Sequence, residues 1–444
     1  MSVSKFIATP SHETLPAGAD VVIIGGGPAG TAALWALDRA EPGLRIVLIE
    51  RSERLGAGST LASLENFRSC WPMVCNARQM ARSVEIFENA DDYLGEGAAQ
   101  SVALRKRGYL FCGFNEAHAR ALHADVERLH AIGLTHIEYL DADEVRYRFG
   151  WLGERVIAAK YDPIAGWLDS NALIHKFVQN AANASIIFGI ADAQIVVEGG
   201  RVCGVRTPFG TIAAPAVVIA AGAHARAVGK TAGVDLPILV RPRQSFTTGW
   251  RHDAFPADGP MVIGAAPHPH VRPEAASGAI FGWEYTWHCK SYCASHGSNA
   301  AHDALREPVT PPDALKDPRF PSLTLALFAR QFGHSDGEGF ADGRYLRGLH
   351  HNIGYYVYRD ERAAYTIGDD GRQHPYDSER AIIDRHPEVD GLFVSIAHGG
   401  HGIMTAPSAG EILACHVLGR PLPDPAFADY RFDAHWVEYD EGVL

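Results

Sequence analysis

The sequence predicts an α/β fold that is divided into two domains. Its 444 residues, of which 47% are hydrophobic and 45 are glycines, are enough for two domain cores rather than one. Residues 20–50 read as strand, glycine turn, helix and strand, which is typical of a parallel sheet. Residues 230–360 are rich in Trp, Tyr, His and Pro and have weak periodicity, which indicates a second domain of different construction.

The first predicted unit is a strand-helix-strand motif at residues 20–50. Within residues 20–24 and 45–49, one charged residue is followed by a continuous apolar run rich in β-branched side chains, as expected for parallel strands buried on both faces. Between them lie the turn Gly25-Gly26-Gly27-Pro28-Ala29-Gly30 and a helical stretch, and the second strand ends at Glu50, 20 residues after Gly30. This context predicts a Rossmann-type dinucleotide-binding unit.

Each glycine of the turn has a physical role in that prediction. Gly25 permits the tight turn, Gly27 lets the backbone approach a pyrophosphate, and Gly30 lets helix and strand pack closely. The helix N-terminus offers N–H groups to the phosphates, and Glu50 is expected to accept hydrogen bonds from ribose hydroxyls. A glycine turn without any ligand is the alternative.

The rest of the chain shows no second glycine fingerprint of this kind. Gly399-Gly400-His401-Gly402 lacks the spacing. A single dinucleotide site beside a large aromatic domain favours FAD that is reduced by the substrate itself, rather than by a pyridine nucleotide.

The remaining elements are predicted from periodicity and turn residues. Residues 194–197, 201–206 and 216–220 are expected to form a strand meander, and residues 117–132 a helix. Residues 391–397 read as a strand, followed by a glycine loop and a helix over 406–418. We therefore expect a discontinuous FAD-binding domain over 18–98, 155–228 and 360–444. The second, α+β domain is expected over 99–154 and 229–359, on a mixed or antiparallel sheet.

Composition excludes several other classes of function. The 40 basic and 52 acidic residues give a net charge of −12, and no Lys/Arg run could hold a nucleic-acid backbone. No apolar stretch approaches the roughly 20 residues of a membrane span, and residues 1–19 lack the pattern of a signal peptide, so we expect a cytoplasmic protein. The seven scattered cysteines, and the histidine pairs 268/270 and 350/351, lack the spacing of a metal site.

Four further segments resemble the family of D-amino-acid oxidase, sarcosine oxidase and glycine oxidase. They are residues 58–68, with Gly58-Ser59-Thr60 and Asn66-Phe67-Arg68, residues 161–169, residues 217–223, and residues 398–410. The last segment, His398 to Gly410, matches the family's C-terminal flavin loop and helix. Backbone N–H groups at that helix start can stabilise the negative charge that a flavin gains on reduction.

The resemblance implies FAD as cofactor and a set of residues around it. The residues expected to bind FAD are Gly25, Gly27, Pro28, Ala29, Gly30, Glu50, Arg51, Ser59, Thr60, Val196, Ala221, Gly222, Gly399, Gly400, His401, Gly402, Ile403 and Met404. The residues expected at the flavin ring or the substrate are Arg68, His296, His401, Tyr356 and Arg359. Trp283, Tyr285 and Trp287 are either the wall of an apolar substrate pocket or ordinary core.

The sequence also departs from the sarcosine oxidase branch. Tyr292 stands where that branch has a lysine near the flavin, which puts fast reaction with oxygen in doubt, and residues 354–359 lack its flavin-linking cysteine. We therefore expect FAD to be bound non-covalently. Tyr355 or Tyr356 takes the place of the carboxylate-binding arginine of glycine and D-amino-acid oxidases, and either Arg359 or Arg362 could substitute for it or form a structural ion pair.

Three functions follow from these patterns. The leading one is oxidation of the C–N bond of an amine or amino acid, with secondary and N-methyl amines first, by hydride transfer to the flavin and hydrolysis of the imine. O2 or another acceptor would then reoxidise the flavin. The alternatives are oxidation of a 2-hydroxy acid, with His296 or His401 as base, and a non-catalytic role in which FAD only stabilises the fold. The oligomeric state is open.

Overall fold

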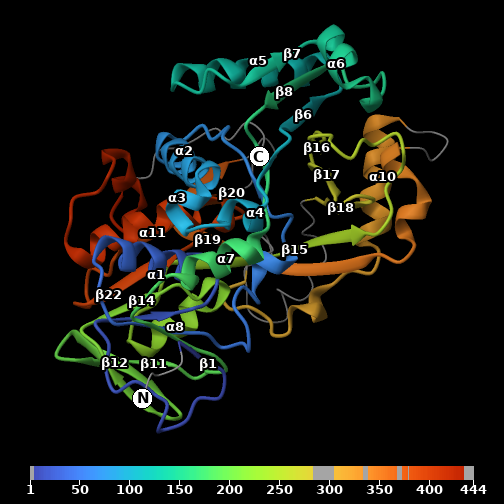
Figure 1. Cartoon of the computed structure of the whole chain (residues 1–444). Helices are drawn as coiled ribbons and strands as arrows, with labels where there is room; N and C mark the ends of the chain where they lie inside the picture. Colours follow the sequence, from blue (N-terminus) through green and yellow to red (C-terminus); the bar gives the residue numbers. More distant parts are fainter. Residues whose placement is uncertain (1–4, 284–304, 334–338, 368–372, 379, 435–444) are drawn as a thin grey trace.

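The computed structural model describes residues 5–283, 305–333, 339–367, 373–378 and 380–434. Figure 1 shows two bodies of sheet, one beneath helices α1 and α11 and one extending from β15 to β7.

The first body is built on a seven-stranded sheet. Its strands, in spatial order, are β1 (Phe6–Ile7), β10 (Ala184–Ile187), β3 (Ile46–Ile49), β2 (Val21–Ile24), β14 (Ala216–Ile219), β22 (Leu392–Ile396) and β21 (Ile382–Arg385). All neighbouring pairs are parallel except β22 with β21. The chain runs from β2 to β3 and β10 on one side, then to β14 on the other, so the order of the strands reverses between β2 and β14. Ligands of such sheets bind at the carboxyl ends of the strands at this reversal.

Different layers cover the two faces of this sheet. One face packs against α1 (Pro28–Ala40), α2 (Val74–Glu88), α7 (Ser170–Gln179) and α11 (Gly402–Leu418). The other packs against α8 (Ala225–Thr231) and an antiparallel meander of β11 (Gln194–Glu198), β12 (Arg201–Thr207) and β13 (Gly210–Ala213). Because both faces are covered, β2 and β3 are buried along their whole length.

Helices α1 and α11 cross at very short distance. A Cβ added to Gly410 of α11 would lie 2.4 Å from the carbonyl oxygen of Ala32 in α1. The glycine at 410 therefore fixes how the C-terminal helix sits on the helix that follows the first glycine turn.

The second body is a nine-stranded mixed sheet. Its strands, in spatial order, are β20 (Gln373–Ser378), β19 (His350–Ile367), β15 (Ile238–Thr248), β18 (Gly278–Gly282), β17 (His270–Glu274), β16 (Met261–Ile263), β6 (Tyr109–Gly113), β8 (Ala158–Asp162) and β7 (Glu138–Leu140). The β16–β6 pair is parallel and the other pairs are antiparallel. Its helices are α5 (Glu116–Ala131), α6 (Ala142–Phe149) and α10 (Phe320–Phe332).

Short elements complete the described chain. The strands β4 (Asn66–Phe67), β9 (Gly166–Trp167) and β5 (Arg105–Lys106) form a small sheet, and the 3₁₀ helix η1 (Ser59–Ala62) and helices α3 (Ala90–Leu94) and α4 (Ala98–Val102) lie nearby in sequence. No helix in the described ranges combines the length and apolarity that a membrane crossing requires.

The predicted α/β fold with a parallel sheet and a second, mixed sheet is confirmed. The helix expected over 117–132 is α5. Two details were wrong. The third meander strand is β13, whereas residues 216–219 join the parallel sheet, because their continuous apolar run is buried between two layers. The C-terminal helix begins at Gly402 instead of 406.

The domain boundaries stay a prediction. The segment 155–228, assigned from sequence to the FAD-binding domain, includes β8, which pairs with β6 and β7 in the nine-stranded sheet.

Candidate functional site

The glycine turn lies at the strand reversal of the parallel sheet. Gly25 has φ +122°, and a Cβ there would lie 2.3 Å from the carbonyl oxygen of Ala220 at the end of β14. A Cβ on Gly30 would lie 1.9 Å from the carbonyl oxygen of Gly25. A Cβ on Gly27, at the N-cap of α1, would meet nothing within 4 Å. Contacts within the protein therefore require glycine at positions 25 and 30. Gly27, in contrast, borders open space in front of a helix N-terminus.

Glu50 connects the end of β3 to this turn. Its side chain is 7% exposed, and its Oε2 accepts a hydrogen bond from the backbone N–H of Gly26 at 2.7 Å. Its Oε1 accepts from the backbone N–H of Ser52 at 2.8 Å. The carboxylate is thus held beside the turn, where the acidic residue of a dinucleotide site stands.

These features fit an FAD adenosine diphosphate group. The space beside Gly27, the N–H groups at the start of α1 and the adjacent carboxylate of Glu50 are what a pyrophosphate and a ribose require. Pro28 and Ala29 would hold the phosphates as the first residues of α1.

The other residues predicted to bind FAD lie on several different elements. Arg51 follows Glu50, and its Nη1 is 2.8 Å from Nε2 of His224, while Ala221 and Gly222 follow β14 directly. Ser59 and Thr60 form the start of η1, and the Ser59 hydroxyl accepts from the backbone N–H of Tyr355 at 3.1 Å. Val196 lies in β11 of the meander, at the bulge of that strand.

The C-terminal glycine loop is fixed by β19. The Gly399 N–H donates to the carbonyl oxygen of Val357 at 2.7 Å, and Gly399 has φ +55°. A Cβ on Gly400 would lie 2.6 Å from Cε2 of Tyr356, so the phenol ring packs directly on the loop. Helix α11 begins immediately afterwards, with His401 as its N-cap residue. The loop thus presents a helix start toward the β19 side chains, as the family resemblance predicts for the flavin.

His401 is buried at this helix start. Its ring is 4.4 Å from the ring of Trp71 in an edge-to-face arrangement, and the side chain is 4% exposed. Burial, and secondly the nearby charge of Arg68, hold the pKa of His401 well below its ordinary value. The imidazole is therefore neutral at pH 7.

Arg68 also contacts Trp71. Its guanidinium carbon is 4.0 Å from the centroid of the Trp71 ring, a cation–π contact. Asp162, which is fully buried, accepts from the backbone N–H groups of Ser69 at 2.6 Å and Cys70 at 3.1 Å. Its carboxylate thereby fixes the turn that follows Arg68.

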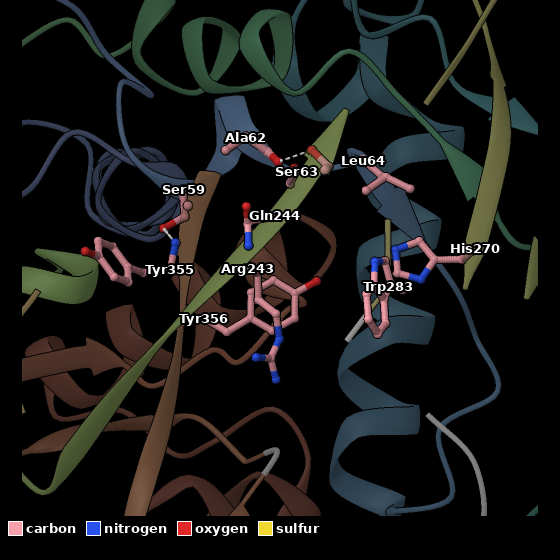
Figure 2. A pocket seen from close by; sticks show the side chains of 12 residues that line it. Ser59, Ala62, Ser63, Leu64, Arg243, Gln244, His270, Trp283, Tyr355 and Tyr356 are labelled. Carbon is pink, nitrogen blue, oxygen red and sulfur yellow. Dashed lines mark hydrogen bonds between the residues drawn. The ribbon is translucent and has the colours of Figure 1, made fainter. Parts of the chain in front are cut away.

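Two adjoining cavities lie between the glycine loop and the nine-stranded sheet. The first cavity, of about 70 Å³, is lined by Ser59, Ala62, Ser63, Leu64, Arg243, Gln244, Ser245, His270, Trp283, Gly354, Tyr355 and Tyr356 (Figure 2). The second cavity, of about 110 Å³, is lined by Ser63, Leu64, Glu65, Asn66, Arg68, Trp71, Tyr109, Met261, Ile263, His270, Tyr356, Tyr358, Gly400, His401, Ile403 and Met404. The residues Ser63, Leu64, His270 and Tyr356 belong to both linings, so the two cavities adjoin each other.

The structure brings together most residues that were expected at the flavin ring or substrate. Arg68, His401 and Tyr356 line the second cavity. Arg359 is not among the lining residues; it is 5% exposed, and its Nη2 donates to the carbonyl oxygen of Arg431 at 2.5 Å. His296 lies outside the described residues, as do Tyr285, Tyr292 and Trp287.

Several lining residues were not identified from the sequence as parts of this site, chiefly Arg243, His270 and Tyr109. For Arg243 the sequence contains a usable pattern, because apolar and basic residues alternate from Val240 to Arg243. In a strand this alternation places Arg241 and Arg243 on one face, as the burial pattern of β15 shows. His270 was weighed only as a metal ligand. In the part of the chain that the structure describes, no group of three His, Cys, Asp or Glu side chains could hold a metal ion.

Comparison with known proteins places the chain in a family. The sequence profile described as "FAD dependent oxidoreductase", the D-amino-acid oxidase family, matches residues 20–416. FAD-dependent oxidoreductase domain-containing protein 1 of Xenopus laevis is 22% identical over 96% of this chain and 85% of its own length. A D-amino acid dehydrogenase of Cereibacter sphaeroides is 33% identical over 44% of this chain and 46% of its own.

The fold agrees with this assignment. The crystal structure of L-proline dehydrogenase from P. horikoshii superposes with a TM-score of 0.72 at 22% identity, over 94% of this chain and 97% of that one. Both the sequence match and the geometry of the glycine turn point to the same cofactor. The chain therefore belongs to the FAD dependent oxidoreductase family, and it is an enzyme that uses FAD.

Proposed function

We propose that the protein oxidises the C–N bond of an amino acid, with N-methyl and other secondary amino acids as the first candidates. The observation that carries the proposal is the position of Arg243. This residue lines the first cavity together with Tyr356, and Tyr356 in turn packs on the C-terminal glycine loop at Gly400. FAD held by the glycine turn at residues 25–30 would supply the hydride acceptor for the substrate α-carbon, and the resulting imine would hydrolyse in water.

Arg243 suits the carboxylate of such a substrate. Its guanidinium carbon is 5.3 Å from the centroid of the Tyr356 ring, across the β15–β19 pair. From sequence, Tyr355 or Tyr356 takes the place of the family's carboxylate-binding arginine. Arg243 supplies a positive charge from the neighbouring strand instead, and its fork can bind a carboxylate through two parallel hydrogen bonds.

Arg359 is a weaker candidate for this role. Its guanidinium is buried against the backbone of Arg431, and it lines neither cavity. The side chain of Arg362 lies outside the described residues.

Arg68 and His401 provide the polar end of the second cavity. Arg68 brings a positive charge to the site, and the neutral His401 lies at the N-terminus of α11, where backbone N–H groups and the helix dipole favour negative charge. This arrangement would stabilise the negative charge that a flavin gains on reduction. Trp71, Tyr109 and Tyr356 add aromatic surface to the same lining.

The test is anaerobic bleaching of the yellow holoenzyme by a panel of compounds. N-methyl amino acids, primary amino acids of both configurations and matched amines without the carboxylate are compared with 2-hydroxy acids. We expect bleaching by at least one amino acid, and much slower bleaching by the amine that lacks its carboxylate. Bleaching by hydroxy acids alone would overturn the proposal, as would equal rates with and without the carboxylate.

Two further readouts use the same sample. The rate at which colour returns on admission of air tells whether O2 or another acceptor takes the electrons. Acid precipitation should release the flavin into the supernatant, because none of the five cysteines in the described residues lines either cavity. Flavin retained in the pellet would contradict non-covalent binding.

A further inference from the structure

Tyr109 is a buried tyrosine in the wall of the second cavity. It begins β6, where it pairs with Met261 of β16 and with Asp162 of β8. Its side chain is 4% exposed, and its ring stacks with that of Phe111 at a centroid distance of 6.2 Å. Met261 lines the same cavity, and Asp162 fixes the turn that follows Arg68. Strand pairing therefore places this phenol in the part of the site that also holds Arg68.

The hydroxyl of Tyr109 has no hydrogen-bond partner in the part of the chain that the structure describes. Its oxygen is not one of the side-chain polar atoms that are closed off from solvent without a partner, so the small exposed part of the residue includes it. Since Tyr109 lines the second cavity, we place the hydroxyl at the cavity surface. Buried tyrosines usually pair this group within the protein, so the hydroxyl of Tyr109 is suited to a ligand.

Other buried tyrosines behave in the usual way. The hydroxyl of Tyr345, which is fully buried, accepts from the backbone N–H of His252 at 3.0 Å. The hydroxyl of Tyr355 donates to the carbonyl oxygen of Val309 at 2.8 Å. These hydroxyls serve the fold, and the contrast sets Tyr109 apart.

The phenol of Tyr109 stays neutral at pH 7. Burial raises the pKa of Tyr109 above its ordinary value, and the charges of Arg68 and Arg272 oppose that rise only in part. A neutral phenol has one O–H to donate and lone pairs that accept. Tyr356, which belongs to both cavity linings, also acts electrostatically on Tyr109, so the two phenols are close to each other.

The proposed function indicates which part of the substrate comes to this hydroxyl. Arg243 in the first cavity is assigned to the carboxylate, and the amino nitrogen is the next polar group along an amino acid. Met261 and Ile263 in the second lining are apolar and suit a methyl group or a hydrocarbon side chain. Arg68 cannot accept a hydrogen bond, because a guanidinium has only donors, whereas the oxygen of Tyr109 can accept an N–H.

Building on the proposed function, we propose that Tyr109 is a substrate-binding residue whose phenol oxygen accepts an N–H hydrogen bond from the amino nitrogen of the substrate. The contact orients the nitrogen and selects amines that have an N–H. Primary and secondary amino acids keep an N–H as neutral amines, whereas tertiary amines have none. Tyr109 therefore favours secondary over tertiary amines in a lining where the methyl groups of both would fit.

The experiment compares anaerobic flavin reduction in Tyr109→Phe and wild-type holoenzyme. Phenylalanine keeps the ring and removes only the oxygen. The two compounds are the best amino acid of the panel and its tertiary-amine derivative, in which methyl groups replace every N–H of the neutral amine. We expect the second-order rate constant of the amino acid to fall about 5- to 50-fold, and that of the derivative to change little. The FAD content of the variant should equal that of wild type.

Urea unfolding of the substrate-free holoenzyme is the second readout. The hydroxyl of Tyr109 has no partner to lose among the described residues, so Tyr109→Phe should leave the unfolding midpoint unchanged or raise it. Tyr345→Phe is the matched control, because it changes a tyrosine outside both linings and leaves the N–H of His252 without its acceptor. It should lower the midpoint and leave flavin reduction close to that of wild type.

Three results would overturn the inference. One is an unchanged rate constant for the amino acid in Tyr109→Phe. Another is an equal loss with the amino acid and with its tertiary-amine derivative, or a loss of FAD content, since the hydroxyl would then serve another group than the nitrogen. The third is a midpoint lowered as far as in Tyr345→Phe, which would show that the hydroxyl stabilises the fold. If wild-type enzyme is bleached by no amino acid, the proposed function fails instead, and the role of Tyr109 fails with it.

Discussion

The two ends of the site are built in different ways. The glycine turn at residues 25–30 is six consecutive residues, four of them glycines, and it depends on backbone conformation and on positions without side chains. The substrate wall is made of side chains from β15, β17 and β19, which begin at residues 238, 270 and 350 and meet only through sheet pairing. We therefore expect phosphate binding to depend on the local backbone, and substrate recognition to depend on strand register.

The largest effect is expected from Gly30→Ala, which tests the backbone side of the comparison. The new Cβ would lie 1.9 Å from the carbonyl oxygen of Gly25, and backbone cannot move aside as a side chain can. We expect loss of FAD binding together with a drop in the free energy of unfolding of more than about 4 kcal/mol. Flavin absorbance per mole of protein and urea unfolding measure both.

Gly150→Ala is the matched control. A Cβ there would meet nothing within 4 Å, and the residue has φ −55°, which alanine adopts readily. This variant should retain FAD and stability. If Gly30→Ala also retained both, close packing would not be the reason for that glycine.

The next largest effect tests the side-chain wall. Arg243→Gln removes the cation that we assign to the substrate carboxylate, and kcat/KM should fall about 10²- to 10³-fold, mostly through KM. An analogue without the carboxylate should be affected little. Steady-state kinetics on the two compounds measure the difference.

Arg241→Gln is the control for that variant. Arg241 lies on the same face of β15, two residues earlier, and stacks on Tyr358, but it is outside both cavity linings. Equal losses of kcat/KM in the two variants would show that only the general positive field matters. The register of β15 against β19 would then contribute nothing to recognition of the substrate carboxylate.

This contrast also explains what could be predicted from the sequence. The spacing of one strand-turn-helix-strand unit made it possible to predict Gly25, Gly27, Gly30 and Glu50 from the sequence. The contact of Arg243 with Tyr356 could not be predicted, because it depends on the pairing of β15 with β19, which are more than a hundred residues apart. His270 was missed as a lining residue because its place in the site follows from the pairing of β17 with β18, which spacing does not reveal.

A smaller effect concerns His398, which lies beside the C-terminal glycine loop. Burial lowers the pKa of its imidazole to about 4, so the ring stays neutral at pH 7. As pH falls from about 6.5 to 4, the unfolded chain binds a proton at His398 that the folded chain does not, so stability is lost. The loss is up to about 3 kcal/mol.

Urea unfolding of wild type and His398→Gln across this pH range measures that contribution. The stability of the variant should fall less steeply, by about 1.4 kcal/mol per pH unit, which corresponds to one proton. Identical slopes would mean that His398 can be protonated in the folded enzyme. In that case water would reach the C-terminal glycine loop more readily than the burial of His398 indicates.

Gly27→Ala is expected to have the smallest effect on stability. Within the glycine turn, it separates a glycine that the ligand requires from one that the fold requires. Its Cβ would meet no atom of the protein within 4 Å, so the apoprotein should lose less than about 1 kcal/mol, mainly from the poorer N-cap. The same Cβ would project where we place the pyrophosphate, and FAD affinity should fall tenfold or more. Titration of apoprotein with FAD, beside unfolding of the apoprotein, measures both quantities. Unchanged FAD affinity would move the pyrophosphate away from Gly27, while a large loss of apoprotein stability would mean that this glycine, like Gly30, is required by the fold rather than by the ligand.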